Sequence, residues 1–76
     1  PYAVQLETAL GVAEARQRAR AWMARGVAAY ALADVERGAS VYTGAFESPE
    51  QAALLLAALR DEAPGAVLAF RVGRSF

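Results

Sequence analysis

The sequence predicts an α+β domain of the ferredoxin-like class: a four-stranded antiparallel sheet with two helices on one face. Four short segments alternate apolar and polar residues, the two-residue period of half-buried strands. Two longer segments repeat apolar residues every third or fourth position, the spacing of amphipathic helices. The segments follow the order β-α-β-β-α-β, which is the order of the split-βαβ sheet.

The first strand is expected over residues 2–7, and the first helix over residues 11–25. In the strand segment, one alternating set comprises Tyr2, Val4 and Leu6, and the other comprises Ala3, Gln5 and Glu7. Gly26 follows the helix segment, at the position where a glycine commonly ends a helix.

A hairpin and a second helix follow. The expected elements are a strand over 27–35, a polar turn over 36–38, a strand over 39–43, a helix to about residue 60 and a strand over 67–72. Ser48, Pro49 and Gln51 predict the start of the second helix, as N-cap, first helical residue and capping-box partner. Residues 73–76 are expected to be a frayed end or the start of a continuation.

Right-handed crossovers place both helices on the same face of the sheet. The strands, numbered along the chain, are expected in the spatial order four, one, three, two. The predicted core consists of Val4, Leu6, Ala15, Trp22, Ala29, Ala31, Val41, Leu55, Leu59 and Phe70. The opposite face of the sheet is left open to solvent or to a ligand.

Composition limits the function. The chain of 76 residues makes one domain, 1–76, and reads as part of a larger protein. Eight basic residues balance eight acidic ones, whereas nucleic-acid binders carry a basic excess. Without His or Cys, ordinary nucleophilic dyads and zinc sites are excluded. We therefore expect no enzyme, no cofactor or metal, no nucleic-acid partner and no membrane insertion by this segment.

The open face carries the candidate site. Strand parity places on it Ala3, Gln5, Glu7, Tyr30, Leu32, Ser40, Tyr42, Val67, Ala69 and Arg71. Aromatic rings stack on sugars, while amide, hydroxyl and guanidinium groups bond their rims. Tyrosine also favours strands for reasons of propensity alone, so carbohydrate binding and ordinary strand formation both remain open. Neither Gln5 nor Tyr42 is expected in the core, so alanine at either position should leave the fold intact.

Three segments together resemble SPOR (sporulation-related) domains. Residues 2–6, Tyr-Ala-Val-Gln-Leu, resemble the first strand of that family. The segment 26–30, Gly-Val-Ala-Ala-Tyr, is similar to the family's link after the first helix. Residues 41–52 resemble its second motif, a strand that leads into a helix beginning at Ser.

The resemblance implies a βαββαβ fold that binds peptidoglycan glycan strands stripped of stem peptides, in the periplasm or elsewhere in the cell envelope, often in cell division. The implied glycan-binding residues, together with those chosen from strand parity, are Gln5, Thr8, Tyr30, Ser40, Tyr42 and Arg71. Glu7 and Gly38 depart from the family pattern, Glu7 by placing a charge beside the site and Gly38 by lacking a ring. Two alternatives remain: a module that docks onto an envelope protein complex, and a domain that dimerises through its sheet.

Overall fold

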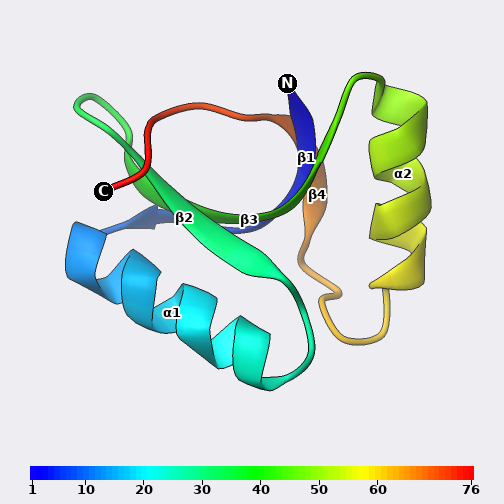
Figure 1. Ribbon diagram of the computed structural model, residues 1–76, viewed down its shortest axis with the longest axis horizontal. Coiled ribbons are helices and arrows are strands. Elements are labelled where there is room, and N and C mark those ends of the chain that lie inside the picture. Colours follow the sequence, from blue (N-terminus) through cyan, green and yellow to red (C-terminus); the bar gives the residue numbers. More distant parts are fainter.

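The computed structural model describes all 76 residues and confirms the predicted fold class (Figure 1). Its elements are β1 (Tyr2–Leu10), α1 (Val12–Ala24), β2 (Ala29–Asp34), β3 (Gly38–Phe46), α2 (Pro49–Ala58) and β4 (Val67–Phe70). All strand pairs are antiparallel, and the spatial order β2-β3-β1-β4 is the predicted one. Neither helix has the length and apolar character that crossing a membrane requires.

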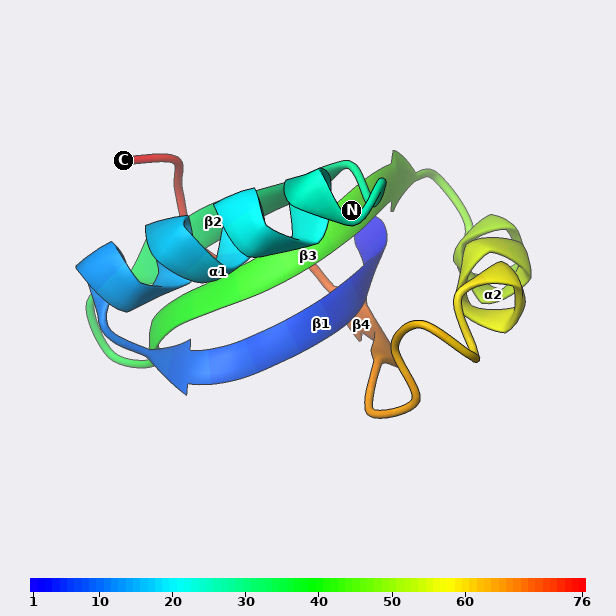
Figure 2. The same ribbon diagram turned by 90° about the horizontal axis from the view of Figure 1, so that it is seen from below.

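Both helices pack on one face of the sheet. Trp22 from α1, Leu55 from α2 and Leu59 just after α2 belong to or pack against a single apolar cluster around Val4 and Val41. Helix α1 lies along β2 and β3, whereas α2 packs against β1, β3 and β4 (Figures 1 and 2). This side of the sheet is called the helix face below, and the other side is called the open face.

Most of the predicted core is buried. The buried members are Val4, Leu6, Ala15, Trp22, Ala29 and Val41. Ala31, Leu55 and Leu59 are only partly buried at the margin of this cluster. Phe70 was wrongly predicted, because its side chain is 60% exposed. It lies at the end of the edge strand β4, where the centroid of its ring is 4.9 Å from that of the neighbouring Tyr2.

Local signals place the helix ends well. Gly26 has a φ of +90°, the left-handed conformation that ends helices at glycine. At the start of α2, the backbone N–H of Gln51 donates to Ser48 Oγ at 3.3 Å, and Pro49 is the first helical residue. The return bond from the Gln51 side chain does not form. The helix itself ends at Ala58, a little before the predicted boundary.

Strand β1 contains a bulge that changes which residues face the helices. Gln5 pairs with Tyr42, but the next partner, Val41, lies opposite Glu7, so β1 has one extra residue here. Glu7 therefore points to the helix face, contrary to the prediction. Its carboxylate accepts a hydrogen bond from Trp22 Nε1 at 2.7 Å and forms an ion pair with Arg18 at 2.8 Å. The Glu7 charge, which was predicted to lie beside the open face, is instead bonded to the side chain of the core tryptophan.

Residues 71–76 continue beyond β4, and residues 73–76 are not the frayed end that was predicted. From β4 the segment crosses the open face to the outer edge of β2 (Figure 1). On the way, the backbone N–H of Val72 donates to the Tyr42 hydroxyl at 3.4 Å. Arg74 and Ala33 then exchange two backbone hydrogen bonds of 2.9 Å each. We call residues 71–76 the C-terminal segment.

Candidate functional site

The C-terminal segment covers part of the open face. Ala3, Leu32 and Tyr42 form a small apolar cluster there, with Tyr30 and Ala69 packed against it. Tyr42 is only 2% exposed, although it lies on the open face as strand parity predicts. A ring so deeply buried cannot stack on a ligand from solvent. In this arrangement Tyr42 supports the site from below.

A cavity of about 140 Å³ remains open between the C-terminal segment and the β2–β3 hairpin. It brings together four of the sequence-predicted residues, which are Gln5, Thr8, Ser40 and Tyr42. The bulge adds one residue to β1. Thr8 therefore lies on the open face at this cavity, in the position that simple alternation gives to the residue before it. Its Oγ1 lies 3.0 Å from Ser40 Oγ, so the two hydroxyls share a hydrogen bond.

Gln5 is the one neutral polar side chain in this cavity that the protein leaves free. It is partly exposed, and its amide makes no hydrogen bond within the protein. A primary amide carries both donors and an acceptor. Together with the hydroxyls of Thr8 and Ser40, it can bond a neutral polar ligand such as a sugar.

Five further residues, which were not among the predicted site residues, also line the cavity, namely Asp34, Arg37, Gly38, Phe70 and Val72. Asp34 is already engaged, since its Oδ1 accepts the backbone N–H of Glu36 at 2.8 Å. The Arg37 side chain is exposed and has no ion-pair partner. The polar turn was visible in the sequence, but only the tertiary fold shows that it stands beside Gln5.

Tyr30 and Arg71 lie outside the cavity. The ring of Tyr30 is 6.0 Å from that of Tyr42, and its hydroxyl donates to the carbonyl oxygen of Gly44. The Arg71 guanidinium lies 6.0 Å from the centre of the Tyr30 ring. Because β4 ends at Phe70, Arg71 belongs to the C-terminal segment instead of the predicted strand.

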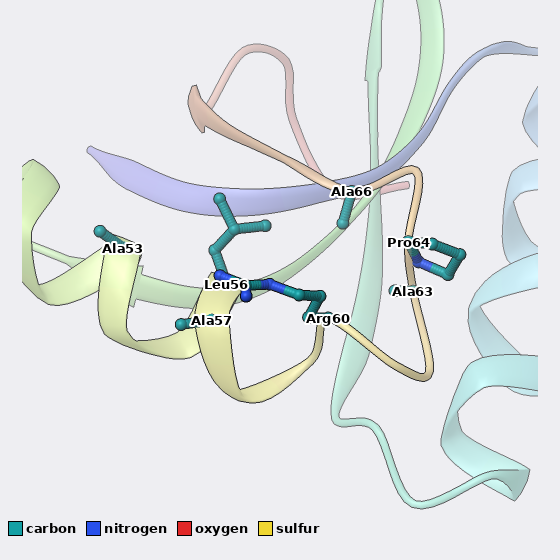
Figure 3. Close-up of a pocket in the computed structure, with 7 residues that line it drawn as sticks. All are labelled: Ala53, Leu56, Ala57, Arg60, Ala63, Pro64 and Ala66. Atoms are coloured by element: carbon teal, nitrogen blue, oxygen red, sulfur yellow. The ribbon is translucent and has the colours of Figure 1, made fainter.

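A second hollow of about 250 Å³ lies at the end of α2 (Figure 3). It is mostly apolar, and its lining consists of Ala53, Leu56, Ala57, Arg60, Ala63, Pro64 and Ala66. It contains none of the sequence-predicted residues, and Arg60 is its one polar side chain. The open-face cavity is therefore the better candidate for a polar ligand.

The structure defines a small α+β domain with a ferredoxin-like sheet and one polar cavity on its open face. In comparisons with known proteins, no family model, no curated protein and no solved structure matches the chain. The chemistry of the cavity is that of hydrogen bonding, with one amide, three hydroxyls, one carboxylate and one guanidinium among its lining side chains.

Proposed function

We propose that this domain is a non-catalytic binding module for peptidoglycan glycan strands in the bacterial cell envelope, where it serves as part of a larger protein. The observation that carries the proposal is the open-face cavity, where Gln5, Thr8 and Ser40 converge from β1 and β3. These neutral groups suit the hydroxyl and acetamido groups of a sugar. The resemblance of residues 2–6 and 41–52 to SPOR domains supports the same ligand.

The cavity assigns different roles from those expected from strand parity. Because Tyr42 is buried, it would lie beneath a bound glycan and would not stack on it. Arg37 replaces Arg71 as the cation nearest the cavity. A glycan strand without stem peptides still carries the carboxylates of its lactyl groups, and Arg37 is placed to meet one of them with a charge-assisted hydrogen bond.

Co-sedimentation with purified sacculi, with and without stem peptides, tests this proposal. Gln5→Ala should lower sacculus binding several-fold, since it removes the free amide, with a loss of about 1–2 kcal/mol. Arg37→Ala should also weaken binding, and its effect should shrink at high salt. Arg60→Ala is the matched control, because it removes an exposed arginine at the end of α2. Wild-type protein that folds but does not sediment with either form of sacculus would end the proposal.

A second candidate function is docking onto a protein of an envelope complex through the same open face. The C-terminal segment favours it, since the backbone of Val72 already contacts the hydroxyl of Tyr42 there. The open face can therefore accommodate extended polypeptide. Retention of a protein partner by the wild-type domain, lost in Gln5→Ala and without any binding to sacculi, would favour docking over glycan binding.

A further inference from the structure

A groove separate from the open-face cavity runs between α1 and the outer edge of β2. Its volume is about 390 Å³. Arg16, Arg20 and Met23 line the side formed by α1, and Ala29 and Ala31 line the side formed by β2. Met23 is 50% exposed in this groove, so part of its apolar surface has no partner within the domain.

The β2 side of the groove presents unpaired backbone. Ala33 directs its N–H and its C=O away from β3, because both bond Arg74. In an antiparallel sheet these directions repeat every second residue. Ala31 and Ala29 therefore direct theirs outward too, and neither forms a backbone bond to a residue outside the sheet. Strands with such free edges accept an added strand.

The C-terminal segment shows how an added strand would lie. The bridge between Arg74 and Ala33 is antiparallel, which brings Phe76 to the position opposite Ala31. The Phe76 ring points toward α1 and packs under the guanidinium of Arg16, 4.8 Å from its centre. Phe76 forms no backbone bond to Ala31, and its side chain is 38% exposed. A stronger strand can therefore take its place.

The positive charge of the groove favours an acidic partner. The one ion pair in the domain joins Arg18 to Glu7, so Arg16 and Arg20 have no acidic partner. A second copy of the domain paired edge to edge would bring both arginines of each copy to one interface, where like charges repel. An acidic segment of another protein would meet the two arginines favourably.

We propose that this groove binds an extended acidic peptide segment of a partner protein, which adds as an antiparallel strand beside Ala29 and Ala31. Side chains of the added strand alternate, so every second residue faces α1. An acidic residue there meets Arg16 or Arg20, and an apolar residue covers Met23. This site shares no lining residue with the open-face cavity, and peptide and sacculus can be assayed separately.

Fluorescence anisotropy with the labelled heptapeptide Thr-Glu-Thr-Leu-Thr-Glu-Thr tests the proposal. Saturable binding is expected, together with slower amide exchange at Ala31. The double variant Arg16→Glu, Arg20→Glu should weaken binding about tenfold or more, and Arg16→Gln, Arg20→Gln should weaken it less. Arg60→Glu, an equal charge change at the end of α2, should bind like the wild type.

Two control probes separate the backbone contribution from the charge. Replacing both Glu residues of the peptide by Lys should abolish its binding. N-methylation of alternate residues of the peptide should also abolish binding, because it removes their backbone N–H donors. Equal binding by the wild type and by a folded Glu double variant would overturn the proposal, as would binding of the methylated probe. A domain that dimerises through β2 and ignores the peptide would overturn it as well.

Discussion

Replacing Gly73 by alanine should detach the C-terminal segment from the sheet while the rest of the domain stays folded. Gly73 has a φ of +105°, a conformation that L side chains rarely adopt. A Cβ at this position would lie 2.6 Å from the carbonyl oxygen of Ala33. The bridge between Arg74 and Ala33 must then open, because the carbonyl belongs to the backbone of β2 and cannot rotate away.

The expected loss of folding stability is the sum of the interactions that the bridge between Arg74 and Ala33 holds in place. It holds two backbone hydrogen bonds of 2.9 Å, worth about 1 kcal/mol each. The cation–π contact between Arg16 and Phe76 adds about 0.5–1 kcal/mol at this exposed site. The loss is limited to about 2–3 kcal/mol, since the segment can leave without disturbing the core. A domain of this size has a stability of roughly 4–11 kcal/mol, so the variant should remain folded.

Urea denaturation measures this loss, and amide exchange at Ala33 locates it. Gly65→Ala is the matched control, because Gly65 has ordinary backbone angles and nothing lies within 4 Å of an added Cβ. This control should be neutral or stabilising by about 0.4–1 kcal/mol. If Gly73→Ala were as stable as the control and kept a protected Ala33 amide, the structural role given to the segment would be wrong.

Four other substitutions, at three positions, test the core and β1 by urea denaturation. Trp22→Ala should destabilise the domain by about 3–5 kcal/mol, whereas Trp22→Phe should lose about 1–3 kcal/mol because the bond to Glu7 disappears; equal losses would contradict a role for that bond. Ala9→Gly should stabilise by about 1 kcal/mol, since Ala9 has a φ of +59° in the bulged part of β1; a loss would contradict this left-handed conformation. Tyr42→Ala should cost about 3 kcal/mol because the ring is buried, and an unchanged stability would restore the exposed role first predicted for it.

Local patterns were enough to predict the elements and their order. The two-residue period predicted the strands. Ser48 predicted a helix start and Gly26 a helix end, because the capping hydrogen bond and the left-handed backbone at these positions depend on residues nearby in the chain. Right-handed crossovers then determined the order of the strands. These features depend on residues close together in the chain, so the sequence carries them directly.

The bulge in β1 could not be predicted from these local patterns. Strict alternation places Glu7 on the open face and gives Thr8 no place there, whereas one unpaired residue moves Glu7 to Trp22 and Thr8 to Ser40. The bulge turns the Glu7 carboxylate to the helix face, where it accepts the N–H of Trp22 from α1, a residue 15 positions away in the chain. Nothing adjacent to Glu7 in the sequence signals it.

The sequence by itself determined a small α+β domain with both helices on one face and polar residues on the other. Only the tertiary structure decided how much of that other face is free. The C-terminal segment buries Tyr42 and brings Val72 to the cavity, while the hairpin places Arg37 near Gln5. Periodicity reports which side of a strand a residue occupies. It does not report which distant segment covers that side, because such coverage depends on contacts between residues far apart in the chain.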